Sequence, residues 1–176
     1  MVDFLTKPNM PIRAEVFSAL FLLCGVFFIQ PQVDACSCLW AGPFLKVVPN
    51  GEWVIRGRVS GYYGEDRNIN LAMDVEVLEV FRGKTQESEL RIWGDDGMLC
   101  RPYVTQFPVG TEWILGLNGP GSKPGCTSNH AISICGQYWL QIKDGKIIGN
   151  IDNEKDQSSS QELSIDEFRT RYCGGD

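Results

Sequence analysis

The stretch Trp53-Val54-Ile55-Arg56-Gly57-Arg58-Val59-Ser60-Gly61-Tyr62-Tyr63 decides the fold. Its apolar side chains alternate with polar ones, which is typical of a half-buried β-strand. The apolar face consists of Trp53, Ile55, Val59 and Tyr63. Gly57 and Gly61 fall on this same face, where a strand that bends round a barrel corner has no room for a side chain. The sequence therefore predicts a long, bent strand, followed by a polar hairpin loop over 64–68.

A second alternating stretch begins at Leu71 and changes phase by one residue after Val77, as a β-bulge would cause. Long, bulged strands are how a small sheet closes on itself. Further strands are expected over 90–93, 112–117 and 131–135, with a hairpin over 138–148 that turns at Asp144-Gly145. These patterns predict a mainly β domain.

Short helical segments are expected on either side of the strands. Residues 42–48 are long enough for one helical turn before Pro49. Residues 150–161 are polar and serine-rich, which indicates a loop. Ser164 and Glu167 then form a capping box, which predicts a short C-terminal helix ending at Cys173.

The N-terminal segment has the features of a secretion signal. Residues 16–29 are an uninterrupted run of 14 apolar or small residues, shorter than the roughly 20 of a membrane-spanning helix. Basic residues precede the run, and Val33-Asp34-Ala35 has the small-x-small character of a signal peptidase site. We expect residues 1–35 to be a signal peptide and 36–176 to be a single secreted domain, extracellular or periplasmic, with no membrane span.

The charge of this domain excludes two kinds of partner. The leader carries two basic and three acidic residues, so its removal changes the net charge from −6 to −5. Nucleic-acid affinity comes largely from cations that replace counterions, and anionic membranes attract basic segments. We therefore expect neither nucleic acid nor an anionic membrane surface as a partner.

The cysteine count indicates a disulfide framework. Of the seven cysteines, Cys24 would leave with the leader. The six that remain are Cys36, Cys38, Cys100, Cys126, Cys135 and Cys173. An even number in an exported chain predicts three disulfides, for which 15 pairings are possible. A zinc site is the weaker interpretation because no C-x-x-C pair occurs.

The chain lacks the usual patterns of an enzyme. It contains one histidine, His130, so a histidine-rich zinc site cannot form. Ser60 stands one place too late for a nucleophile elbow in 57–61, and the glycines after residue 115 do not have the dinucleotide-binding spacing. We expect no enzymatic activity and no cofactor of the protein's own.

Several motifs together resemble one family of secreted proteins. They are Cys36-Ser37-Cys38 at the expected mature N-terminus, Val54-Ile55-Arg56-Gly57, the strand 75–83, Met98-Leu99-Cys100, the strand 111–117 and Ile132-Ser133-Ile134-Cys135. In order and spacing they resemble the N-terminal inhibitory domain of the tissue inhibitors of metalloproteinases, over about residues 36–140. The resemblance implies a netrin-like, five-stranded closed barrel of the OB type, stapled by disulfides.

That family inhibits zinc metalloendopeptidases as a wedge. The resemblance implies that the α-amine and carbonyl of Cys36 chelate the catalytic zinc of the protease at its exchangeable position. The Ser37 side chain would enter the specificity pocket. The rest of the inhibitory ridge would be Cys38, Leu39, Met98, Leu99 and Cys100. The only metal of such a protein is the zinc of its target protease, and we expect a monomer.

The resemblance also implies a disulfide pattern. It pairs Cys36 with Cys100 and Cys38 with Cys135, which leaves Cys126 and Cys173 for a third bond that would fasten the C-terminal helix. The family's own third bridge cannot form, because this chain has no cysteine near Pro49, where the family has its third N-terminal cysteine.

Two alternatives remain open from the sequence. Netrin-like modules share this barrel and serve as extracellular interaction domains without inhibiting proteases. Residues 33–36 also fit a lipoprotein signal, although Asp34 is unusual in one. The difference matters because acylation of the Cys36 amine would remove the lone pair that chelation needs.

Overall fold

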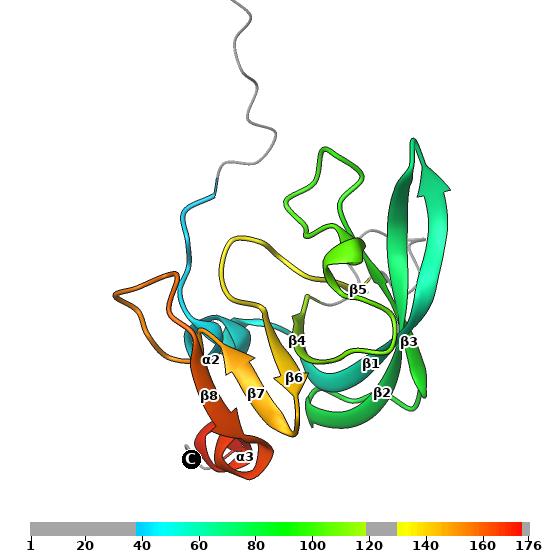
Figure 1. The fold of residues 1–176 in the computed structure, drawn as a ribbon. Helices are drawn as coiled ribbons and strands as arrows, with labels where there is room; N and C mark the ends of the chain where they lie inside the picture. The colour runs from blue at the N-terminus through cyan, green and yellow to red at the C-terminus, as the bar shows by residue number, and fades with distance from the viewer. Residues whose placement is uncertain (1–37, 119–129, 174–176) are drawn as a thin grey trace, which may run out of the picture. The chain divides into compact units, whose positions relative to one another are not determined.

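The computed structural model describes residues 38–118 and 130–173, and Figure 1 traces their arrangement. In these ranges the chain is mainly β, with eight strands in a curled sheet of order β5-β3-β2-β1-β4-β6-β7-β8. The strands are β1 (Trp53–Asp66), β2 (Ile69–Arg82), β3 (Glu89–Trp93), β4 (Glu112–Leu117), β5 (His130–Ala131), β6 (Trp139–Lys143), β7 (Lys146–Gly149) and β8 (Gln161–Ser164). The helices are α2 (Phe44–Val47) and α3 (Ile165–Cys173), with 3-10 turns η1 (Val48–Asn50) and η2 (Val104–Gln106). Among the described helices none is long and apolar enough to cross a membrane.

The long hairpin of β1 and β2 is the backbone of the sheet. Its strands turn at Arg67 and Asn68, whose φ angles of 49° and 64° suit a two-residue hairpin turn. The strand β1 therefore continues to Asp66, and the loop expected over 64–68 is shorter than predicted. Arg56 pairs with Glu79 while Gly57 pairs with Val77, so Leu78 is an extra residue. The bulge predicted after Val77 is confirmed.

Apolar residues are buried on both faces of β1, and they belong to two separate cores. Ile55 and Val59 face the inside of the curl. Val54 faces the opposite side, against α2, α3 and the β6–β8 strands. The inner core contains Ile55, Val59, Met73, Val75, Leu90, Ile92, Val104, Phe107, Trp113, Leu115, Leu117 and Ile132. The outer core contains Phe44, Val47, Val48, Val54, Ile114, Leu140, Ile147, Ile151, Leu163 and Phe168.

The closed five-stranded barrel expected from the resemblance is not confirmed, because the described strands form an open eight-stranded sheet. The reason lies in the second edge of β4. Its residues 112–115 pair with β6, and only Asn118, beyond the strand, forms an isolated bridge to Ala131 of β5. The strand expected over 131–135 is correspondingly short, since β5 ends at Ala131.

The C-terminal helix α3 is capped as the sequence predicted. The Ser164 hydroxyl accepts the N–H of Glu167 at 3.2 Å, and the Glu167 carboxylate accepts the N–H of Ser164 at 2.9 Å. The preceding strand β8 was not expected: it joins Gln161, the last residue of the polar segment, to the residues directly before the helix.

The expected Cys126–Cys173 bond is not formed in the structure, because Cys173 is free and exposed. Packing and an ion pair fasten the helix instead. Phe168 is fully buried against Phe44 and Phe81, and Arg169 donates two hydrogen bonds of 2.9 Å to the Glu79 carboxylate. Packing of Phe168 and the ion pair of Arg169 therefore fasten the helix where a disulfide was predicted.

Candidate inhibitory ridge

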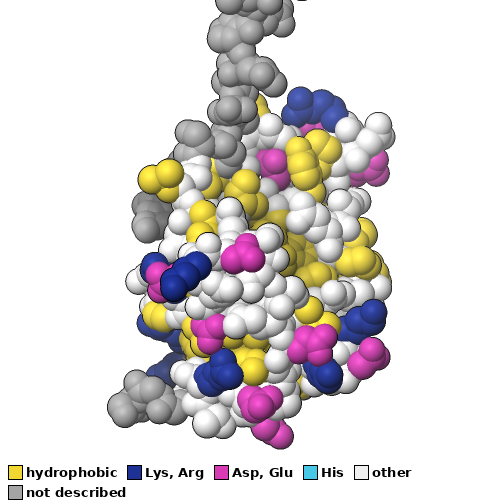
Figure 2. Space-filling model, turned by 60° about the vertical axis from the view of Figure 1, so that its left-hand side comes forward, with side chains coloured by type: hydrophobic (Ala, Val, Ile, Leu, Met, Phe, Trp, Pro, Cys, Tyr) yellow, Lys and Arg dark blue, Asp and Glu magenta, His cyan; other side chains and the backbone are white. Residues whose placement is uncertain are grey.

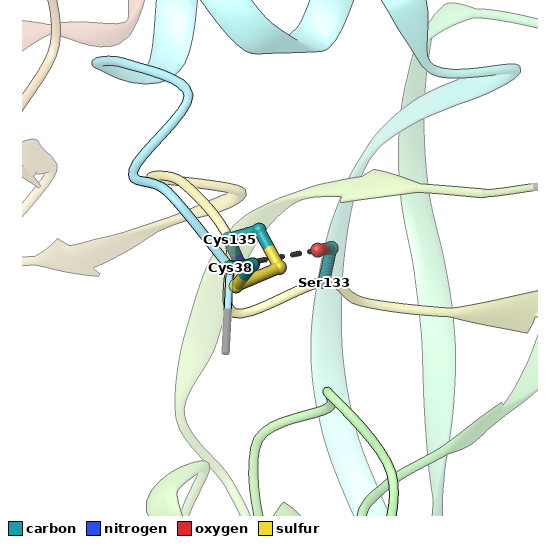
Figure 3. The surroundings of a disulfide bond; sticks show 3 residues. All are labelled: Cys38, Ser133 and Cys135. Carbon is teal, nitrogen blue, oxygen red and sulfur yellow. Dashed lines mark hydrogen bonds between the residues drawn. A yellow bond between two sulfur atoms is a disulfide. The ribbon is translucent and has the colours of Figure 1, made fainter. Parts of the chain in front are cut away.

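A disulfide fastens the N-terminal strip to the segment that follows β5. Cys38 and Cys135 are bonded, with their Cα atoms 5.5 Å apart (Figure 3). The Ser133 hydroxyl accepts the N–H of Cys135 at 3.1 Å, and Ala41 donates its N–H to the Cys135 carbonyl at 2.7 Å. This is the pairing that the resemblance implied, and it holds residues 38–41 alongside Cys135.

The loop that follows β3 joins the same segment from its other side. Ile134 donates its N–H to the Cys100 carbonyl at 3.3 Å. Cys100 is itself disulfide-bonded. Its expected partner Cys36 lies outside the described residues, as do Ser37 and Cys126. The structure therefore brings Cys38, Leu39, Met98, Leu99 and Cys100 into one region.

The loop after β3 is ordered by its own hydrogen bonds. The N–H of Asp95 donates to the Pro102 carbonyl at 3.1 Å across the neck of the loop. The Asp95 carboxylate accepts the N–H of Leu99 at 2.7 Å, and the Asp96 carboxylate accepts the N–H of Met98 at 3.1 Å. Gly97 has a φ of +100°, which side chains other than that of glycine rarely adopt.

Exposed apolar side chains mark the crest of this region, which we call the ridge: residues 38–41, 98–100 and 133–135. Leu39 is 94% exposed and Met98 is 71% exposed. Leu99 and Ile134 are each about 40% exposed. Apolar groups held this far out of the core are typical of a contact surface for another protein.

Ile134 was missed as a ridge residue in the sequence. Ile132 and Ile134 both lie in the strand expected over 131–135, two residues apart, which is the spacing of side chains on one strand face. The strand ends at Ala131, however, and the two side chains differ in burial: Ile132 is 1% exposed and Ile134 is 39% exposed. The sequence carries no signal for this change of direction.

Outside the ridge, many of the described charged side chains form ion pairs. Figure 2 shows one face, where hydrophobic side chains gather mainly in the upper half and centre and charges of both signs are spread from top to bottom. On the outer face of β1 and β4, Arg56 and Arg58 each lie 2.7 Å from the Glu112 carboxylate. Their hydrogen bonds lower the pKa of Glu112. No large field of one sign is visible on the face in Figure 2.

His130 is the one histidine, and it is buried in β5. Its ring packs edge-on against Trp53 at 5.1 Å, and its Nδ1 has no hydrogen-bond partner within the described ranges. Burial lowers the pKa of His130. No group of three or more His, Cys, Asp or Glu side chains in residues 38–118 and 130–173 could hold a metal ion.

No protein-family model and no curated protein matches the chain. What the ridge can do chemically follows from its own geometry. The strip is joined to the segment after β5 by a disulfide and the loop by a hydrogen bond, so both lose little conformational freedom when they contact another molecule.

Proposed function

We propose that the chain, after export and removal of residues 1–35, is a secreted, monomeric inhibitor of zinc metalloendopeptidases. One observation carries the proposal. The Cys38–Cys135 disulfide and the hydrogen bond from Ile134 to Cys100 hold the N-terminal strip beside the loop that presents Met98 and Leu99. A wedge needs such rigidity, because ordering a flexible strip would subtract from its affinity.

The proposed chemistry begins three residues before the exposed Leu39. Processing would leave Cys36 with a free α-amine, which with its carbonyl oxygen forms a bidentate chelator. A catalytic zinc has three protein ligands and one exchangeable position, which normally holds water. An α-amine has a pKa of about 8, so deprotonating it near pH 7 costs only about 1 kcal/mol. Ser37 would enter the specificity pocket, and a Cys36–Cys100 bond would clamp the terminus to the loop.

We further propose that strands β1 to β5 act as a five-stranded barrel of the OB type that carries the ridge. Two contacts support closure: the parallel pairing of Ile92 with His130, and the bridge in which Asn118 donates its N–H to Ala131 at 3.0 Å. The β6–β8 strands are then an extension of β4 outside the barrel.

The decisive experiment compares the mature protein with a variant that carries one extra alanine before Cys36, on a panel of zinc endopeptidases. Intact mass first establishes that each chain begins where intended and that the terminal amine is unmodified. The native protein should inhibit, and the extended one should not, because its Cys36 nitrogen is an amide without a basic lone pair.

Equal inhibition by both proteins would reject chelation. Absence of inhibition by the native protein would reject the proposed function and favour the netrin-like interaction module. A lipidated Cys36 in the mass spectrum would favour a membrane-anchored lipoprotein. Both proteins should unfold at the same urea concentration, which separates a chemical effect at the terminus from loss of structure.

A further inference from the structure

A buried carboxylate lies beneath the exposed loop of the ridge. Asp95 is 9% exposed, and its Oδ1 atom accepts the backbone N–H of Leu99 at 2.7 Å. Its own N–H donates to the Pro102 carbonyl at the neck of the loop. A single residue therefore ties the neck of the loop to its crest.

The crest has few other ways to hold its shape. Leu99 accepts an N–H from Arg101 at 2.8 Å, and Cys100 accepts one from Ile134 at 3.3 Å. Among the hydrogen bonds of the described ranges, Met98 makes one, from its N–H to the carboxylate of the half-buried Asp96. The bond from Leu99 to Asp95 is the shortest of these and the one with a buried, charged acceptor. Charge-assisted hydrogen bonds are roughly twice as strong as neutral ones.

This backbone arrangement also decides how the loop can contact a partner. The N–H groups of Met98 and Leu99 and the carbonyls of Leu99 and Cys100 are already used within the protein. This leaves few backbone groups at the crest for pairing with a strand of another protein. We therefore expect the loop to act mainly through its side chains, whose direction depends on the backbone that Asp95 holds.

We propose that Asp95 is a positioning residue of the ridge. Its carboxylate fixes the backbone of Leu99, so that Met98 and Leu99 present their side chains to the protease in one conformation. This inference rests on the proposed function for its partner, but its structural half, the fixing of Leu99, can be measured without any protease.

The test uses three variants of the full mature chain: Asp95→Ala, Asp95→Asn and the control Asp66→Ala. Alanine removes the acceptor, whereas asparagine keeps an oxygen in the same place. Asp66→Ala makes the same change of charge at an exposed carboxylate whose ion pair is with its neighbour Arg67. Amide hydrogen exchange at Leu99 is measured by NMR, and inhibition constants are measured on the most sensitive protease of the panel.

Asp95→Ala should speed exchange at Leu99 about tenfold and weaken inhibition about tenfold, mainly through faster dissociation. Asp95→Asn should restore most of both, and Asp66→Ala should change neither. Exchange at Leu99 that is unaltered in Asp95→Ala would overturn the inference. Faster exchange at Leu99 with unaltered inhibition would also overturn it, because the conformation of the loop would then not matter for contact with the protease.

Two further outcomes are separable. If the native protein inhibits nothing, the proposed function fails, while the exchange data still support or overturn the fixing of Leu99 by Asp95. If Asp95→Ala does not fold, the native protein replaces it: NMR should detect a scalar coupling across the hydrogen bond between the Leu99 amide nitrogen and the Asp95 carboxyl carbon. Absence of this coupling in the native protein would overturn the inference.

Discussion

The backbone N–H of Ile134 lies 3.3 Å from the carbonyl oxygen of Cys100 and joins the loop after β3 to the segment after β5. Because the next residue, Cys135, is bonded to Cys38, this contact places a loop and a terminal strip on one support. The loop after β3 and the N-terminal strip are far apart in the sequence, so only the fold brings them together.

Breaking the Cys38–Cys135 disulfide should lower the free energy of unfolding by about 4.7 kcal/mol, since the bond closes a loop with a sequence separation of 97. Urea unfolding of Cys38→Ser, Cys135→Ser and the double variant measures the effect. All three should lose the same amount, because either single change breaks the bond. A double variant that loses about twice as much as either single one would contradict this prediction.

Gly57 and Gly61 were both expected to lack room for a side chain, and the structure separates them. A Cβ on Gly57 would lie 2.3 Å from a methyl group of Val75, whereas one on Gly61 would meet nothing within 4 Å. Gly57→Ala should therefore cost about 1–3 kcal/mol of unfolding free energy, and Gly61→Ala should be nearly neutral. Thermal unfolding of the two variants checks this, and equal melting temperatures would refute it.

Acidification should weaken the fold through His130. Burial lowers its pKa in the folded protein, and the nearby charges of Glu87 and Glu52 oppose this only in part. The unfolded chain therefore binds the proton more readily, with a pKa of about 6.5. Stability is full above that pH and is lost as the pH falls through it toward the folded-state pKa.

The measurement is the free energy of urea unfolding between about pH 8 and pH 5. A His130→Leu variant should show a flatter profile in this window. Glu112, whose pKa is lowered by its hydrogen bonds to Arg56 and Arg58, contributes stability that is lost only below about pH 4.3, so it cannot account for the slope. Identical slopes for the native protein and the variant would count against the prediction.

The C-terminal helix should depend on Phe168 and not on Cys173. Phe168 is fully buried and packs against Phe44, Phe81 and Tyr172, so Phe168→Ala should cost about 3–5 kcal/mol. Cys173 is exposed and free, so Cys173→Ser should change stability by less than about 0.5 kcal/mol. Urea unfolding measures both, and thiol titration of the native protein should detect Cys173. A large loss in Cys173→Ser would point to a disulfide.

Much of the fold was predictable because its signals are local. The turn at Asp144-Gly145, the capping box of Ser164 and Glu167, and the bulge at Leu78 each depend on neighbouring residues, and all three are present. The strand β8 and the short β5 were not predicted, because their extent is decided by which partner strand is available.

The candidate site divides in the same way. Met98, Leu99 and Leu39 were named from the sequence by resemblance, and their exposure agrees with a contact role. Asp95 was not named as a site residue, and Ile134 was named only within the motif 132–135 that carries the resemblance. In the sequence, the buried carboxylate of Asp95 looks the same as an ordinary loop charge. Ile134, which is exposed after the end of β5, likewise looks the same as an ordinary core residue.

Local patterns in the chain specify the alternation of β1, its bulged partner and the capped helix, because period, turn chemistry and capping act within a few residues. The folded arrangement alone specifies that β1 is buried on both faces, that β6 occupies most of the second edge of β4, and that Cys38 meets Cys135 beside Cys100. The reason is that burial and pairing depend on which distant segments compete for the same face or edge, and no local pattern records that competition.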